Sequence, residues 1–419
     1  MEESSSNRAN LVRLLVGVAV GAGLLYWWGG WALPVVILAL LLMIMGHEFG
    51  HFITAKRAGM KVTDFFVGFG PVVWATQIGE TRYGVRAIPA GGYVKVPGMT
   101  WTEKVDPADE ARTYRQATYP RKVLFASAGS LMHLVMAFAL VWVSLTFVGL
   151  PSSSHVGIGG FTPWQGYSHN AAQSAGLRVG DRILSIDGKP VTGATTLINT
   201  VHDHVGRVVT LVVERDGHRM TLHVTPVDGR KLVVNGVPLA KGSTPQGYIG
   251  VELVNQVVHE SVISAIPSSF STMGSLITQT AHAFVQRFSP SGLSNLVHLV
   301  TTPSSTKNPT QQLKRPISIV GAARLAVQGS QAGPGILLAV LVTVNISVGL
   351  LNILPILPLD GGHVALATYE RVRSRRGRRY HADANKMTPL AYGFMTLLLL
   401  LFAATLYLDI AHPIANPFR

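Results

Sequence analysis

The chain has 419 residues, of which 48% are hydrophobic and only 13% charged, about half the charged fraction of a soluble domain, so it belongs in a lipid bilayer. Its formal net charge of +14 would suit a nucleic-acid-binding protein. However, the basic residues cluster beside apolar stretches, as the positive-inside rule for membrane proteins predicts. We therefore expect no nucleic-acid binding. The absence of cysteine from the sequence excludes disulfides, a thiolate nucleophile and a cysteine-ligated metal.

Several apolar stretches are each long enough, at about twenty residues, to cross a bilayer as a helix. Five are expected, at residues 10–29, 32–55, 122–149, 335–357 and 388–408. The first is interpreted as a retained helix, because it lacks a small-residue cleavage site and leads directly into the second stretch. These features predict a polytopic α-helical membrane protein with an extra N-terminal span.

Basic residues in the short loops predict the orientation of the chain in the membrane. They are Arg8, Arg13, Lys56, Arg57, Lys61 and the run from Arg371 to Arg379. The sides that carry them are expected to be cytoplasmic. The N-terminus is then inside, and the long segment 150–334 and the C-terminus are outside.

Residues 64–100 alternate glycine with aromatic and β-branched residues, most clearly at 65–70 and 91–96. That pattern predicts strands joined by tight turns. Two interpretations remain open for this region. It is either an ordinary cytoplasmic hairpin or a membrane-associated sheet that enters the protein to meet an extended peptide.

The outer segment begins with a recognisable pattern at residues 174–188, followed by alternating strands at 208–213 and 221–224. The pattern resembles a PDZ domain of the bacterial protease-associated type, a fold that holds a peptide by adding it to a sheet edge. Residues 257–334 show amphipathic helical stretches and a Ser/Thr/Pro-rich loop near 301–310. We therefore expect an inserted, β-rich PDZ domain outside the membrane, followed by helices.

The expected organisation of the chain follows from these segments in order. It comprises an N-terminal helix (1–30), a second helix that contains residues 47–51 (31–58), a cytoplasmic-side, membrane-associated β region (59–121), a third helix (122–150), a PDZ-like domain (151–256), amphipathic helices and a loop (257–334), a fourth helix (335–367), a basic loop (368–387) and a C-terminal helix with its tail (388–419).

The second apolar stretch contains the sequence His-Glu-Phe-Gly-His at residues 47–51. The two histidines, four residues apart, share one helix face and can hold one metal ion, with Glu48 beside them. An unneeded ionisable residue inside a membrane costs about 2.5 kcal/mol or more, so three together indicate a function. The alternative, in which one histidine caps the helix and Glu48 pairs with a nearby basic residue, leaves this coincidence unexplained.

Two histidines leave a catalytic zinc ion one protein ligand short. The fourth apolar stretch ends in residues 352–362, which contain two prolines and the acidic candidate Asp360. A helix that begins near Gly335 descends about 30 Å before its prolines end it, so Asp360 reaches the depth of the histidines. Without the histidines, Asp360 would only mark a turn before two glycines.

An H-E-x-x-H sequence in an early span and N-x-x-P-x-x-P-x-D-G in a later one resemble the site-2 protease family of intramembrane zinc metalloproteases. Residues 68–71, 88–94 and 316–321 are also similar to that family. The single PDZ-like insert resembles its bacterial envelope-signalling branch. The resemblance implies cleavage of transmembrane segments of membrane proteins, such as anti-sigma factors or remnant signal peptides, in the plasma membrane of a bacterial cell.

The resemblance also implies roles for individual residues. The ligands of the Zn²⁺ cofactor would be His47, His51 and Asp360. Glu48 would be the general base, Asn352 would help to hold the substrate backbone, and the strand with Gly91 and Gly92 would receive the substrate. The PDZ-like module would admit only substrates whose outer domain has already been trimmed.

One segment departs from the family pattern. The family usually has Ala-Gly-Pro-x-x-Asn in the span after the sheet, whereas residues 128–133 are Ala-Gly-Ser-Leu-Met-His. His133 is either a neighbour of the metal or a hydrogen-bonding partner of an adjacent helix, and we expect the second role.

Two other classes of function remain as alternatives. A silent scaffold would capture peptides through the PDZ-like module, but it would have no need of Glu48. A transporter would use intramembrane His and Asp as an ion pathway, but the paired repeats and broken helices typical of transporters are not evident.

Overall fold

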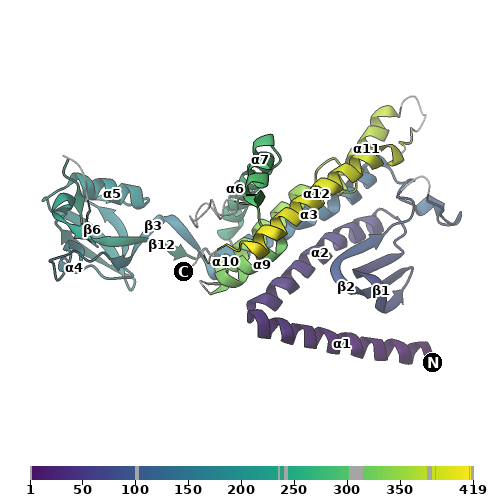
Figure 1. The fold of residues 1–419 in the computed structure, drawn as a ribbon, viewed down its shortest axis with the longest axis horizontal. Helices are drawn as coiled ribbons and strands as arrows, with labels where there is room; N and C mark the ends of the chain where they lie inside the picture. The colour runs from purple at the N-terminus through teal and green to yellow at the C-terminus, as the bar shows by residue number, and fades with distance from the viewer. Residues whose placement is uncertain are drawn as a thin grey trace. The chain divides into compact units, whose positions relative to one another are not determined.

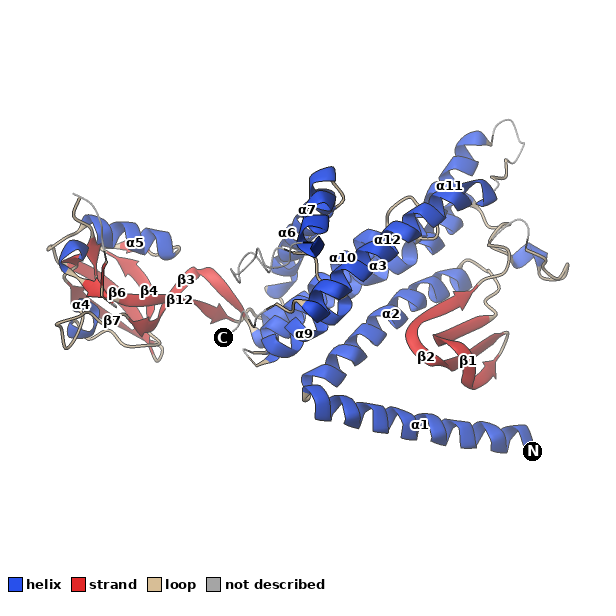
Figure 2. Ribbon diagram, in the orientation of Figure 1, coloured by secondary structure: helices blue, strands red, loops and turns tan. Residues whose placement is uncertain are grey.

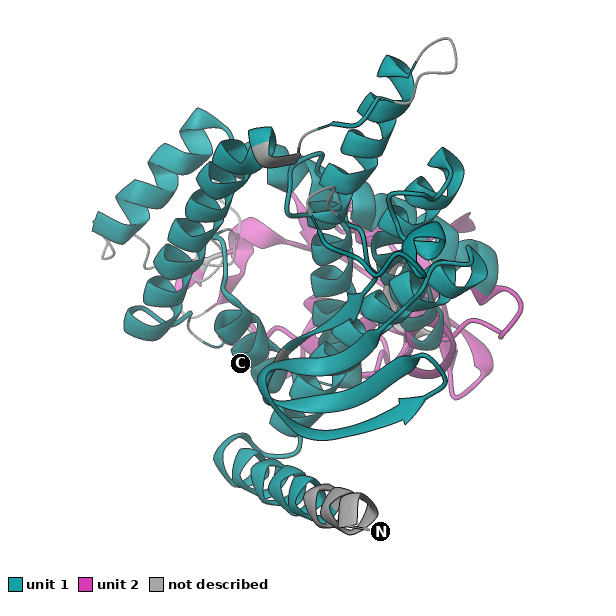
Figure 3. Cartoon of the chain, turned by 90° about the vertical axis from the view of Figure 1, so that its right-hand side faces the viewer, with its two compact units in different colours: residues 1–143, 266–419 teal, residues 144–265 magenta. Residues whose placement is uncertain are grey.

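The fold is given by a computed structural model that describes residues 2–99, 103–234, 236–239, 244–301, 315–331, 333–374, 380–382, 384–414 and 416. The chain forms two compact units (Figure 3). Unit 1 consists of Met1–Val143 and Ile266–Arg419, and unit 2 of Ser144–Ala265.

Within the described residues, five helices are long and apolar enough to cross a membrane, as the sequence predicts. They are α1 (Glu2–Gly29), α2 (Ala32–Arg57), α3 (Tyr119–Val143, continued by the π-helical turn η2, Ser144–Val148), α10 (Pro334–Asn352) and α12 (Thr388–Ala411) (Figures 1 and 2). The helix α10 ends before the predicted limit of residue 357, because Pro355 and Pro358 cannot donate the backbone hydrogen bonds that would continue it.

The centre of unit 1 is α3, which packs against α2, α10 and the helix α11 (Asp360–Arg373). A cluster of buried apolar side chains joins α2 and α10 to α9 (Ile319–Ser330), and it includes Val36, Ala326 and Leu341. By contrast, α1 exposes its apolar side chains, and Trp27 and Trp28 are 86% and 87% exposed. Such exposure suits a lipid-facing helix with aromatic residues at one end.

The predicted β region is a hairpin of two long strands, β1 (Asp64–Ile78) and β2 (Thr81–Lys95). Both strands curl, so residues 64–67 of β1 pair with 92–95 of β2 on one side and with 82–85 on the other. The hairpin contacts α2. Residues 92–95 therefore form an edge segment of the sheet beside the helix that bears the histidines.

Unit 2 is built around one antiparallel sheet with strand order β12-β3-β4-β6-β7, and β5 pairs with β4. The strands are β3 (Leu150–Phe161), β4 (Arg182–Ile186), β5 (Lys189–Pro190), β6 (Val209–Arg215), β7 (His218–Val224) and β12 (Val251–Val258). The predicted strands at 208–213 and 221–224 are thus confirmed. Strand β12 continues past the predicted limit of 256, because it pairs with β3 as far as Val258.

Smaller elements complete unit 2. They are α4 (Ala171–Ser174), α5 (Ala194–Asp203), β8 (Val227–Asp228), η3 (Gly229–Lys231), β9 (Val233–Val234), β10 (Val237–Pro238) and β11 (Gly247–Tyr248).

A buried carboxylate in unit 2 is held by an arginine. Asp181 is 1% exposed, precedes β4 and accepts hydrogen bonds from Arg215. Burial alone would raise the pKa of Asp181, but these bonds and the Arg178 N–H lower it below its usual range.

The predicted helices of residues 257–334 are α6 (Ala265–Arg287), α7 (Pro290–Thr301) and α9, and most of the predicted loop at 301–310 lies outside the described residues. The start of α9 is fixed to α12 by Asp409, which is 2% exposed. Asp409 accepts hydrogen bonds from Arg315 and from the Ser318 N–H. A Cβ at Gly321 would lie 2.2 Å from an oxygen of that carboxylate, so the helix can approach it only with glycine.

The predicted basic loop at 368–387 is shorter than expected, because α11 continues to Arg373. Residues 375–379, which include part of the basic run, lie outside the described residues, and the turn η5 (Ala384–Met387) leads into α12. A buried ion pair, Lys122 Nζ to Glu370 Oε2 at 3.0 Å, joins α11 to α3. The short turn η1 (Glu110–Arg112) precedes α3.

Candidate active site

The two histidines lie one turn apart on α2 and face the same side. Their Nε2 atoms are 3.3 Å apart, and their side chains are 13% and 9% exposed for His47 and His51. Asp360 begins α11 and brings its Oδ2 to 3.4 Å from His47 Nε2 and 3.3 Å from His51 Nε2. Three ligand atoms from two helices thus converge on one point.

The spacing of these atoms fits a zinc ion. With bonds of about 2.0–2.1 Å in a tetrahedron, the ligand atoms of zinc stand about 3.3–3.4 Å from one another. The three observed separations agree with that distance. Two imidazoles and one carboxylate also form a donor set that leaves a fourth position for water, as catalytic zinc sites do.

The remaining atoms of the ligands support the same interpretation. His51 Nδ1 donates to the Phe125 carbonyl at 2.8 Å, so the lone pair of Nε2 is free for a metal. Among the described residues, Asp360 Oδ2 is buried without a hydrogen-bond partner. A bound cation would satisfy that oxygen.

The backbone of α3 passes directly behind the imidazoles at Gly129. A Cβ there would lie 2.2 Å from His47 Cε1 and 2.6 Å from His51 Nε2. No side chain fits at this position while both rings keep their places. Gly129 thus lets α3 support the histidines through its backbone.

Glu48 lies beside the ligands and faces the edge segment of the β hairpin. The carboxylate forms a hydrogen bond with the backbone of Val94. A Cβ at Gly92 would lie 3.2 Å from Glu48 Cγ, and one at Gly91, where φ is +150°, would lie 2.5 Å from the Phe69 ring. Gly92 therefore permits the close approach of the strand to α2, whereas Gly91 lies against Phe69 within the hairpin.

The residues predicted from the sequence are not all equally close to this centre. The structure brings His47, Glu48, His51, Asp360 and Gly92 together. Asn352 is the last residue of α10 and is partly buried, and its role in binding substrate stays a prediction.

His133 makes the contact that the sequence analysis expects. Its Nδ1 forms a hydrogen bond with Oδ1 of Asn345 on α10. Its ring also lies near the metal site, with its centroid 5.2 Å from that of His47. Asn345 was not predicted from the sequence, although a polar residue in the middle of an apolar span is itself a signal.

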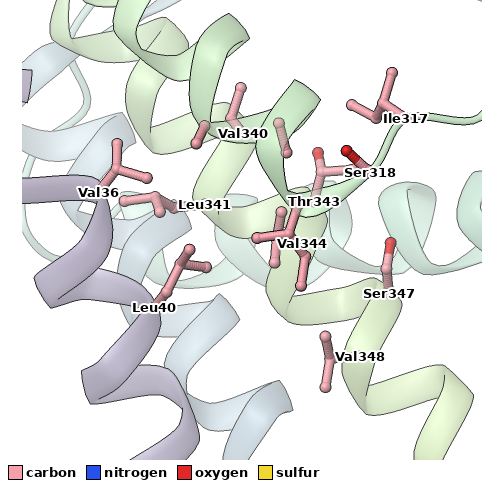
Figure 4. A pocket seen from close by; sticks show the side chains of 13 residues that line it. Val36, Leu40, Ile317, Ser318, Val340, Leu341, Thr343, Val344, Ser347 and Val348 are labelled. Carbon is pink, nitrogen blue, oxygen red and sulfur yellow. The ribbon is translucent and has the colours of Figure 1, made fainter. Parts of the chain in front are cut away.

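A cavity of about 250 Å³ lies between α2, α9 and α10 (Figure 4). Val36 and Leu40 line it from α2. Leu40, His47 and His51 follow Val36 by four, eleven and fifteen residues, so these side chains share one face of the helix. The other lining side chains are mostly apolar or small. The cavity thus lies over the face of α2 that bears the histidines.

The profile of Peptidase family M50 matches residues 35–400. Zinc metalloprotease Rip1 of Mycobacterium tuberculosis is 34% identical over 401 residues, which cover 90% of this chain and 96% of the relative. Zinc metalloprotease Rip1 of Mycolicibacterium smegmatis is 29% identical over 408 residues, with 90% and 97% covered.

Proposed function

The chain belongs to peptidase family M50, and on this premise we propose that its own side chains hold the zinc and carry the chemistry in the arrangement described above. It is an intramembrane zinc metalloprotease of the site-2 protease type. The proposed zinc ligands are His47, His51 and Asp360. The observation that supports them most strongly is the set of three separations of 3.3–3.4 Å between their ligand atoms.

Glu48 is the proposed general base. When bound, zinc would activate a water molecule and polarise the scissile carbonyl. Glu48 takes a proton from that water as its oxygen attacks the carbonyl carbon, and then gives the proton to the leaving nitrogen as the C–N bond breaks. The products are a carboxylic acid and an amine, and Glu48 returns to its starting state.

The edge segment 92–95 is the proposed binding strand for the substrate. A helix shields its carbonyls with its own hydrogen bonds, so a transmembrane substrate must open locally before hydrolysis. An opened segment can add to a sheet edge through its backbone. Because Gly92 lies against Glu48, a peptide on this edge would place a carbonyl near the base and the metal.

The still-helical part of the substrate is proposed to pack against the cavity between α2, α9 and α10 and to place one or two side chains in its volume of about 250 Å³. Its apolar lining suits a transmembrane helix, and small residues such as Ala322, Ala323 and Ser347 permit close approach. From Leu40 the shared face of α2 leads to His47, about 10 Å further along the helix. The opened end of the substrate would then reach the zinc site.

Unit 2 is proposed to be the PDZ-like module that lies outside the membrane, with the N-terminus of the chain in the cytoplasm. A groove of about 390 Å³ runs between α5 and the segment from β11 to β12. Leu197, Val201 and Ile249 give it an apolar floor. On this proposal the groove selects substrates already trimmed outside, such as anti-sigma factors or remnant signal peptides.

The decisive experiment measures cleavage of a model single-span substrate by the full chain in detergent, together with metal analysis. We expect about one zinc per chain and cleavage that is lost on chelation and restored by zinc. Zinc-free protein that still cleaves, or cleavage that survives Glu48→Gln, would refute the proposed site. In that case, peptide capture by unit 2 without hydrolysis would support a scaffold instead.

A further inference from the structure

The cavity between α2, α9 and α10 has a buried floor and an exposed rim (Figure 4). Val36 and Leu341 line the floor and are 2% and 5% exposed. At the rim, Ile317 and Val348 are each 38% exposed, and Ile319 is 62% exposed. Because α2 and α10 are both candidate membrane spans, these exposed apolar side chains face lipid. The cavity therefore opens sideways, in the direction from which a membrane-spanning substrate arrives.

The lining of the cavity suits an apolar occupant. Among the described residues, those that line it carry no charge. Two of its three hydroxyl groups already have partners within the protein. Thr343 Oγ1 donates to the Ala339 carbonyl at 2.8 Å, and Ser318 Oγ accepts from a backbone N–H of α9 at 3.2 Å. Ser347 carries the third hydroxyl, so most of the surface that an occupant would touch is aliphatic.

The size of the cavity admits side chains but no helix. One helical turn is about 5.4 Å long and about 10 Å across, so it occupies about 420 Å³. The cavity measures only about 250 Å³. An apolar cavity of about 150 Å³ is already large enough for a benzene ring. One aromatic side chain therefore fits, because the wall from α9 consists of small residues such as Ala322 and Ala323.

The distance from the cavity to the proposed zinc site limits where in the substrate this side chain can lie. Leu40 lines the cavity, and His47 follows it by seven residues on the same face of α2. Seven helical residues rise about 10 Å. An extended substrate covers that distance with about three residues, and a helical substrate covers it with about seven. The side chain in the cavity would thus lie about three to seven residues from the scissile bond.

We propose that this cavity is a specificity subsite, which accepts one aromatic or similarly large apolar side chain of the transmembrane substrate and thereby selects the peptide bond that reaches the zinc. The inference rests on the proposed function and deepens it. A side chain held in the cavity fixes the register of the substrate along α2, whose histidines lie further along the same face. A lipid acyl chain in the cavity would leave the choice of bond unaffected.

Two residues on facing helices determine what the subsite accepts. Ala323 on α9 leaves the room that a ring needs, and Leu40 on α2 limits how large the ring can be. Lipid tails are as apolar as these side chains, so a substrate side chain gains packing contacts on entering the cavity but no hydrophobic transfer energy. Apolar pockets distinguish side chains by about 10–200-fold, and we expect the lower limit, about 10-fold for phenylalanine over alanine.

The test maps the cleavage of single-span substrates by the full chain in detergent. One phenylalanine is moved in single-residue steps along an otherwise alanine-rich span, and mass spectrometry identifies the cleaved bond. We expect a constant spacing between the phenylalanine and the cleaved bond, with kcat/KM about 10-fold higher than for alanine at that position.

Three variants assign the effect to the cavity. Ala323→Leu should fill it, so that the constant spacing and the preference for phenylalanine both disappear. Leu40→Ala should enlarge it and shift the preference from phenylalanine to tryptophan. Ala403→Leu makes the same change as the first variant at an exposed position of α12 outside the cavity, and it should behave as wild type. Zinc content and thermal stability show whether each variant is folded.

The outcomes separate the subsite from the catalytic function. Zinc-loaded wild-type protein that cleaves none of the substrates would refute the proposed function. Cleavage at a bond that does not follow the phenylalanine would refute only the subsite. A constant spacing that persists unchanged in both Ala323→Leu and Leu40→Ala would show that recognition lies outside this cavity and would also overturn the proposal. If Ala323→Leu does not fold, the shift toward tryptophan in Leu40→Ala decides the question.

Discussion

Replacing Gly129 by alanine should damage the metal site without touching a ligand. The new Cβ would stand 2.2 Å from His47 Cε1, whereas ordinary contact begins at 3.4 Å, so the ring or the helix must shift by the difference of 1.2 Å. A misplacement of about 1 Å in a catalytic group costs about 10²-fold in rate. That factor corresponds to about 2.7 kcal/mol of transition-state stabilisation.

The assay compares cleavage rate and zinc content of Gly129→Ala with those of a matched variant, Gly46→Ala. A Cβ at Gly46 would lie 2.5 Å from Met136 Sδ, a similar overlap, but with the flexible end of a side chain. We expect Gly129→Ala to lose at least about 10²-fold in kcat/KM and to bind zinc more weakly. Gly46→Ala should stay near wild type. Equal effects in the two variants, or full activity in Gly129→Ala, would refute the argument that the α3 backbone supports the histidines.

Three further predictions concern single side chains. Glu48→Gln should lower the cleavage rate by at least about 10²-fold, because it removes the base, while metal analysis still finds zinc; loss of the zinc would contradict the assigned role. Hydrogen bonds from Arg112, which has the largest effect, and from Lys56 lower the pKa of Glu80 from 4.5 to about 2. The stabilisation from the ionised Glu80 should be complete above pH 4.5 and should disappear as the pH falls to about 2. In urea denaturation at pH 6, Glu80→Gln should therefore be less stable than wild type by about 1 kcal/mol or less. This difference in stability should vanish in acid. Asp409→Ala leaves the buried Arg315 unpaired and should cost about 3–5 kcal/mol in a thermal denaturation assay, whereas a stability equal to wild type would show that the pair does not fix α9.

Local patterns in the sequence were sufficient for the parts of the fold that depend on neighbouring residues. The apolar stretches predicted all five candidate spans, and the alternation at 64–100 predicted the two strands β1 and β2. The limit of α10 was misplaced, because apolarity continues past Asn352 although the prolines end the helix. Asn345 was missed, since its partner His133 belongs to a distant part of the chain.

The sequence by itself determined that His47 and His51 share one helix face, because the helical repeat brings residues four apart onto the same side. It also determined the expected chemistry, since Glu48 lies between them. Only the tertiary structure decided that Asp360 completes a set with zinc-like separations and that Gly129 lies behind the rings. Such contacts join residues far apart in the chain, and they depend on how α3, α11 and the hairpin pack around α2, which no local pattern encodes.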